Sequence, residues 1–250
     1  MHTYEWENFT HPNVLQLKTA FHLEDVVASG NNEFEKQVLL KDWVYRTLHH
    51  GNPEKDYAHG SALEILHDTE QGKYMYCTQY ALTLLQSGIA LGWYTRKLGV
   101  DRDHERHEKS FHHGVIDIWS GQWKKWYVID ALHNLHFEKN GIPLNALEIR
   151  MEYLKNKAVD IQGIIGNRKE VRAYKKESEG FDTPSNYFWF FISLRNNFFT
   201  RPGLYDTNAL LWVDSYNQDK IWYKDGEKHA MYASQFIQTS NGDECFPLLH

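Results

Sequence analysis

The chain is poor in cysteine, with two thiols, Cys77 and Cys245, among 250 residues. Two cysteines cannot build the disulfide framework that stabilises small secreted scaffolds. The length and the 42% hydrophobic content instead predict a sizeable apolar core. Cys77 is then either a small buried hydrophobe or a reactive thiol, and the neighbouring sequence has to decide between the two.

The chain also lacks a basic surplus and a long apolar run. A net charge of −6 argues against a nucleic-acid partner. The densest apolar run, "YFWFFI", is far shorter than the roughly 20 residues that span a bilayer, so no membrane association is expected. The opening "MHTYEWENFTHPNV" does not resemble a signal peptide. A cytoplasmic location is expected, or a secreted or periplasmic one if a signal was removed, and the oligomeric state stays open.

Aromatic residues are abundant, with 9 Trp, 15 Tyr and 13 Phe. Such residues can fill a core, and they can also line a groove that binds sugars or peptides. Their number alone does not separate these two uses.

Three segments are expected along the chain. Residues 1–32 form an N-terminal lead-in, residues 33–145 a core, and residues 146–250 a C-terminal elaboration or small second domain with helix and strand character. In the middle segment, apolar residues at helical spacing follow a possible cap at Asn31 or Asn32.

A second helix is predicted from Cys77 to about Leu91, followed by strands in "WYTRKLGV", "SFHHGVIDIW" and "WKKWYVIDAL". The charged run "DRDHERHEK", residues 101–109, is expected to be a solvated loop between the first two strands. Helices followed by an antiparallel sheet indicate an α+β fold.

The position of Cys77, between a loop and a helix, favours catalysis. A helix N-terminus lowers the pKa of a thiol, a histidine can act as its base, and a third group can orient the imidazole. His113 lies on one predicted strand and Asp130 ends the next, so both can share one face of a hairpin. We expect the Cys77 helix to pack on that face and to bring the thiol to His113.

The ordered motifs "GKYMYC", "GIALGWYTRKL", "HGVIDI" and "WYVID", within about residues 35–145, resemble the transglutaminase-like superfamily, which has a papain-like cysteine fold. Cys77, His113 and Asp130 match the triad positions of that family. Val115 and Asp117 stand where the family pattern "HAWVEV" has tryptophan and glutamate. This difference leaves the substrate open.

The resemblance implies a cysteine-dependent acyl-transfer enzyme, most directly a hydrolase of peptide or amide bonds that needs no cofactor. Cys77 would be the nucleophile, His113 the base and Asp130 its orienting partner. Gln71, six residues before Cys77, matches an oxyanion-hole glutamine of papain-like enzymes. The candidate substrate contacts are Tyr76, Gln79, Arg96, His112 and Trp126. His112 is also the alternative base, or else a packed histidine.

Two other functions stay open at this point. A glycan-acting enzyme on the same fold, such as a polysaccharide lyase, would use His and Tyr as acid and base in an aromatic groove and would not need the thiol. A non-catalytic binding module would need no intact triad. The substrate is accordingly a peptide, an amide or a glycan.

A metal site is not expected. His104 and His107 lie close to His112 and His113, but their spacing differs from the HExxH pattern, and the sequence has no CxxC pair.

Overall fold

The computed structural model describes residues 2–52, 61–103, 112–168, 170–175, 180–203, 208–218, 223–224, 227–228 and 236–249. His104 and His107, and with them most of the predicted charged loop, lie outside these residues. The beginning of that loop differs from the prediction, because residues 101–103 are buried and not solvated. Asp101 ends a strand and pairs with Trp189 of the neighbouring strand, which covers this end of the loop.

The described helices are α1 (Pro12–Ala20), α2 (Leu23–Val27), α3 (Glu33–Thr47), α4 (Ala62–Glu70), α5 (Cys77–Ala90), α6 (Ala146–Asn156), the 3₁₀ helix η1 (Pro184–Tyr187) and α8 (Gly242–Cys245). The two predicted helices of the middle segment are α3 and α5. Asn32 caps α3 by accepting a hydrogen bond from the Glu35 N–H at 2.9 Å.

The described strands are β1 (His49–His50), β2 (Tyr74–Met75), β3 (Thr95–Asp101), β4 (His113–Ser120), β5 (Lys125–Asp130), β6 (Leu135–Lys139), β7 (Ile142–Pro143), β8 (Gln162–Ile165), β9 (Glu170–Ala173), β10 (Trp189–Ser193), β11 (Ala209–Trp212), β12 (Tyr223–Lys224), β13 (Glu227–Lys228) and β14 (Ile237–Thr239). The three predicted strands are β3, β4 and β5. Strand β9 falls in a charged stretch that shows no strand pattern.

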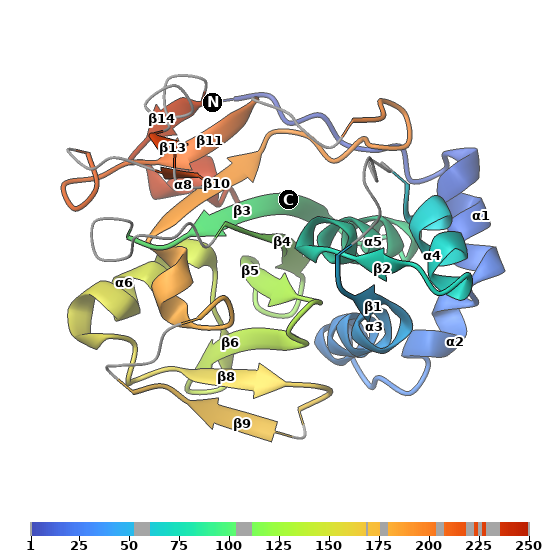
Figure 1. The fold of residues 1–250 in the computed structure, drawn as a ribbon, viewed down its shortest axis with the longest axis horizontal. Helices are drawn as coiled ribbons and strands as arrows, with labels where there is room; N and C mark the ends of the chain where they lie inside the picture. The colour runs from blue at the N-terminus through green and yellow to red at the C-terminus, as the bar shows by residue number, and fades with distance from the viewer. Residues whose placement is uncertain are drawn as a thin grey trace.

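One large sheet organises the described chain, in the order β14-β11-β10-β3-β4-β5-β6-β8-β9, with β7 beside β6. All neighbours are antiparallel except β11 and β14. The chain is therefore α+β, as the sequence predicts. Helices α1 to α5 gather on one side of the sheet and α6 on the other (Figure 1). Strands from before and after residue 145 lie in this same sheet.

The two faces of the sheet carry separate apolar cores. Ile116 and Ile118 of β4 face the core that contains α5, whereas Val115 faces the core that contains α6. His113 has the same phase along β4 as Val115. The expectation that α5 packs on the His113 face is therefore wrong, because the apolar side chains of α5 pair with the isoleucines of the opposite face.

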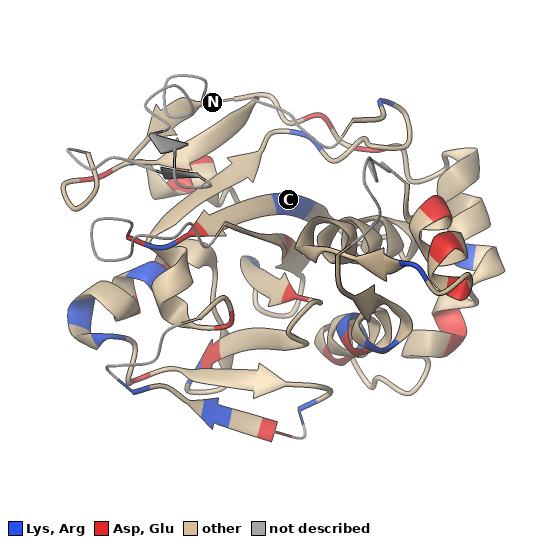
Figure 2. Cartoon of the chain, viewed as in Figure 1, with Lys and Arg blue, Asp and Glu red and all other residues tan. Residues whose placement is uncertain are grey.

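Acidic and basic residues are mixed over the molecule. Figure 2 shows both signs on single elements, for example on α3 and on β9, where Glu170 and Arg172 lie two residues apart. Among the described residues, no helix has both the length and the apolar character to cross a membrane.

A buried lysine ties α3 to the far side of the β5–β6 turn. Lys41 is fully buried, and its Nζ donates to the carbonyl oxygens of Asn134 at 2.8 Å and Gly166 at 3.0 Å. Its Nζ also lies 3.4 Å from Nδ1 of His136, whose Nε2 is 2.9 Å from a Glu138 oxygen. Because a carboxylate only accepts, Nε2 of His136 carries the proton and Nδ1 accepts from Lys41.

We expect Lys41→Met to lower the free energy of unfolding by about 2 kcal/mol, because it leaves buried carbonyl oxygens without donors. Urea denaturation measures this change. The control is Lys36→Met, at a partly exposed position of the same helix, which should change stability by less than about 0.5 kcal/mol. Equal free energies of unfolding for the two variants would show that the buried Lys41 amine does not stabilise the fold.

Candidate active site

The local sequence places Cys77 at the first position of α5. Helix α4 ends at Glu70, and Gly72, with φ of +79°, turns the chain towards β2. The Tyr76 N–H donates to the side-chain oxygen of Gln79 at 3.1 Å, which closes the helix start from within the first turn. The thiol is partly exposed, at the end of a 14-residue helix whose dipole favours a negative charge there.

The start of β4 lies against this first turn. A Cβ on Gly114 would be 3.6 Å from the Cα of Thr78, so the strand backbone runs close beside the helix start. The thiol thereby reaches His113, the first residue of β4, although the rest of α5 packs on the other face of the sheet. His113 is near enough to lower the pKa of the Cys77 thiol.

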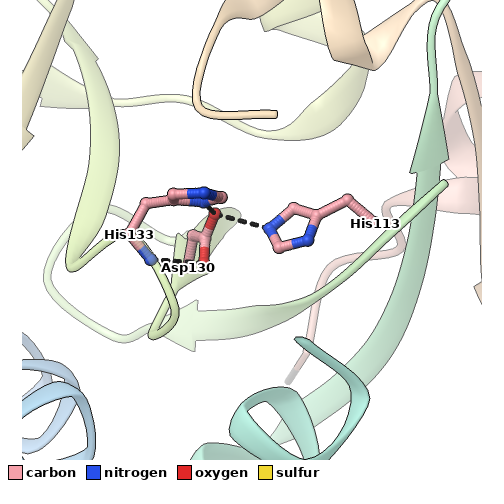
Figure 3. A group of neighbouring side chains, drawn as sticks. All are labelled: His113, Asp130 and His133. Atoms are coloured by element: carbon pink, nitrogen blue, oxygen red, sulfur yellow. Dashed lines mark hydrogen bonds and ion pairs between the residues drawn. The ribbon is translucent and has the colours of Figure 1, made fainter. Parts of the chain in front are cut away.

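His113 and Asp130 form a buried pair. Nε2 of His113 is 2.7 Å from Oδ2 of Asp130, and the two side chains are 2% and 3% exposed (Figure 3). An ionised carboxylate only accepts, so the proton of the neutral imidazole sits on Nε2. Nδ1 is then free to take the thiol proton. The predicted shared phase of these residues is present: both lie on the face of Val115 and Val128.

The pKa values of the three groups move in the directions that an ion pair requires. Burial alone would lower the pKa of His113, but the charge and hydrogen bond of Asp130 outweigh it and raise that pKa to about 10. Burial alone would raise the pKa of Asp130, but the charge and hydrogen bond of His113, with the hydrogen bond of His133, hold it well below its usual range.

Burial also acts on Cys77, where by itself it would raise the pKa of the thiol. The hydrogen bond and charge of His113 oppose it, with smaller help from the Gly114 N–H and the Thr78 side chain, and the net pKa lies below the ordinary value. The arrangement favours a thiolate beside an imidazolium, the reactive form of a cysteine nucleophile.

A second histidine contacts the same carboxylate, and the sequence reasoning did not assign it to the site. Nδ1 of His133 is 2.8 Å from Oδ2 of Asp130, and its ring centroid is 4.9 Å from that of His113 (Figure 3). The available signal was the spacing: a histidine three residues after a strand-ending aspartate can fold back onto it through a tight turn.

The ligand-type atoms of His113, Asp130 and His133 lie within 4.8 Å of one another. Around a tetrahedral zinc ion, adjacent nitrogen and oxygen ligands are about 3.3 Å apart. The two nitrogen–oxygen distances of 2.7 and 2.8 Å are shorter and fit direct hydrogen bonds. The arrangement of His113, Asp130 and His133 therefore fits a hydrogen-bonded network that binds and transfers protons.

The remaining candidates near the thiol have different surroundings. Gln71 is exposed, and its Nε2 lies 2.9 Å from His67 on the surface of α4. Gln79 is buried and occupied by the helix cap. Tyr76 is 45% exposed, and its hydroxyl donates to Asn52 at 3.2 Å. Of these three, Gln71 and Tyr76 are exposed and Gln79 is not.

Arg96 and Trp126 belong to the interior. Both are buried; the guanidinium of Arg96 lies 3.9 Å from the ring centroid of Trp126 and pairs with Asp117 at 2.7 Å. Arg96 also donates to the carbonyl oxygen of Cys245 at 2.8 Å. The ring of His112 stacks on Phe191 with 5.9 Å between centroids. These contacts are all with the protein's own groups.

A hollow of about 560 Å³ adjoins the segment that leads to Cys77. Tyr74 and Tyr80, three residues before and after the thiol in sequence, both contribute to it. Its described lining is Tyr45, Leu48, His49, His50, Gly72, Tyr74 and Tyr80.

No protein-family model matches the chain, and no curated protein matches it. A crystal structure described as that of a putative cysteine protease from Cytophaga hutchinsonii is similar, with a TM-score of 0.38 and 14% sequence identity. The match covers 67% of this chain and 52% of that one, so the chain spans about half the length of this neighbour.

Proposed function

We propose that the chain is a cysteine-dependent acyl-transfer enzyme of the transglutaminase-like type, and that it hydrolyses peptide or amide bonds. The observation that supports this most directly is the sequence of neighbours Cys77, His113 and Asp130, in which the imidazole and the carboxylate are buried. Each group has the neighbour that its catalytic role requires.

In the proposed mechanism, the Cys77 thiolate attacks the carbonyl carbon and a C–S bond forms while the C=O electrons move to oxygen. Backbone N–H groups in the first turn of α5 would donate to that oxyanion. The His113 imidazolium then gives its Nδ1 proton to the leaving nitrogen as the C–N bond breaks. Water then attacks the thioester carbon while His113 accepts a proton from it, and the C–S bond breaks to release the acid and restore the Cys77 thiolate.

Residues outside the array keep narrower roles in this proposal. Asp130 holds the Nε2 proton of His113 and stabilises the imidazolium. The exposed Tyr76, one residue before the thiol, is where the substrate would lie. Gln71 would have to leave its contact with His67 to serve as an oxyanion donor. Arg96 and Trp126 are buried and are not expected to contact the substrate.

The pH dependence of amide hydrolysis follows from the two shifted pKa values. The pKa of Cys77 is lowered and that of His113 is raised to about 10, so the ion pair forms below the pH where a free thiol ionises. We expect kcat/KM to rise on an acid limb below pH about 8.5 and to fall only as His113 loses its proton. A pH–rate profile with chromogenic peptide and amide substrates measures both limbs.

Blocking the thiol separates this function from its alternatives. We expect iodoacetamide-treated protein to lose amide hydrolysis in proportion to alkylation of Cys77. A uronic-acid polysaccharide, followed by the absorbance of unsaturated products, is the comparison substrate. Cleavage of that polysaccharide by the alkylated protein, with no amide hydrolysis by the untreated one, would replace the proposal with a lyase.

A further inference from the structure

His133 is bound to both oxygens of the Asp130 carboxylate. Its Nδ1 lies 2.8 Å from Oδ2, and its backbone N–H donates to Oδ1 at 3.2 Å. The proton of Nδ1 must point at Asp130, because the carboxylate has none to give. Oδ2 thus accepts two imidazole N–H groups, one from His113 and one from His133 (Figure 3).

The turn that carries His133 is itself held from α3. The carbonyl oxygen of Asn134 accepts from Lys41 at 2.8 Å, and the Asn134 amide donates to Asp42 at 2.7 Å. Asn134 has φ of +52°, in the left-handed region that asparagine tolerates better than most residues. The turn is therefore fixed by Lys41 and Asp42, which lie about 90 residues away in sequence. An unsupported loop would let the His133 ring turn to solvent.

We propose that His133 is a positioning residue for the reaction, acting through Asp130. The inference rests on the proposed function. The backbone N–H of His133 holds Oδ1, and the imidazole N–H of His133 gives Oδ2 a second donor beside that of His113, which fixes the direction in which Oδ2 points. His133 thereby keeps Oδ2 aligned with Nε2 of His113 and keeps Nδ1 of His113 aimed at the thiol. Its side chain is 26% exposed, so it does this from the edge of the site and does not belong to the core.

The variants that test this are His133→Leu, which fills the space without a donor, and His133→Asn, whose side-chain N–H₂ can occupy the place of Nδ1. We expect His133→Leu to lower kcat about 10- to 100-fold, by analogy with the loss of a hydrogen-bond partner that orients a metal-bound histidine. KM should change little, because no substrate contact is lost. His133→Asn should stay within about threefold of the wild type.

The second readout does not depend on turnover. In a Cys77→Ala background, the Nε2 proton of His113, bonded to a buried carboxylate, should give a downfield proton resonance in NMR spectra. We expect that resonance to persist with His133→Asn and to be lost by exchange with solvent in His133→Leu. Melting curves of each variant test whether the fold is retained.

The outcomes separate the two proposals. An unchanged resonance and unchanged kcat in His133→Leu would overturn the positioning role, and so would equal loss in both variants, since the donor would then be irrelevant. If the wild type hydrolyses no amide, the proposed function fails, and the resonance in the Cys77→Ala background still decides whether His133 orients His113 through Asp130.

Discussion

Replacing Cys77 with alanine is expected to reduce amide turnover by about 10⁵- to 10⁶-fold, to what binding and the oxyanion donors alone supply. The reason is that the hydrogen-bonded array contains one thiol, and the acyl group has no other nucleophile to accept it in this mechanism. Steady-state hydrolysis of the best substrate from the amide panel measures the loss. Melting temperature should change little, because Cys77 is not fully buried and the substitution removes one sulfur atom.

The matched control is the second cysteine. Cys245 is fully buried in the core that contains α6, and burial raises the pKa of its thiol to about 12. Cys245→Ala should keep kcat within a few-fold, with a modest loss of stability from the missing sulfur. Turnover by Cys77→Ala close to that of the wild type would rule out the cysteine mechanism.

The second large effect is expected at Asp130. Asp130→Asn should reduce kcat by about 10⁴-fold, as when the carboxylate of a triad is replaced by an amide. An amide cannot stabilise the imidazolium, and its N–H₂ group, if turned to His113, would favour the proton on Nδ1, where it blocks acceptance from the thiol. Asp130 also accepts from His133, so an amide N–H₂ group turned to this side removes the common acceptor of both histidines.

Kinetics at several pH values distinguish this effect from general destabilisation. Loss of the carboxylate charge removes what raises the pKa of His113, so the basic limb of the pH–rate profile should move to lower pH. A variant that only weakens the fold would keep the wild-type profile with a lower melting temperature. Activity within tenfold of the wild type, in a folded Asp130→Asn protein, would contradict the role given to Asp130.

The parts of the site that the sequence predicts are those with local signals. The apolar spacing after Cys77 predicts α5, and the alternation along β4 and β5 puts His113 and Asp130 in phase. These signals depend on neighbours within one element or one hairpin. They place the two buried members of the array correctly relative to each other.

What the sequence does not predict depends on contacts distant along the chain. Lys41 reaches Asn134 across 93 residues, and Arg96 reaches Cys245 across 149. No periodicity reports such pairs, so the support of the His133 turn and the burial of Arg96 come only from the fold. The face on which α5 packs is another case, since the alternation along β4 shows two faces and does not say which one the helix covers.

The proposed mechanism depends on a thiolate–imidazolium pair between Cys77 and His113. The most direct measurement is the rate of iodoacetamide alkylation of Cys77 against pH, followed by mass spectrometry, in the wild type and in His113→Ala. We predict that the wild type reacts at least tenfold faster than the variant at pH about 6, while Cys245 stays unmodified in both. Equal rates that rise together near pH 8.5, the value of an ordinary thiol, would contradict the pair and the mechanism built on it.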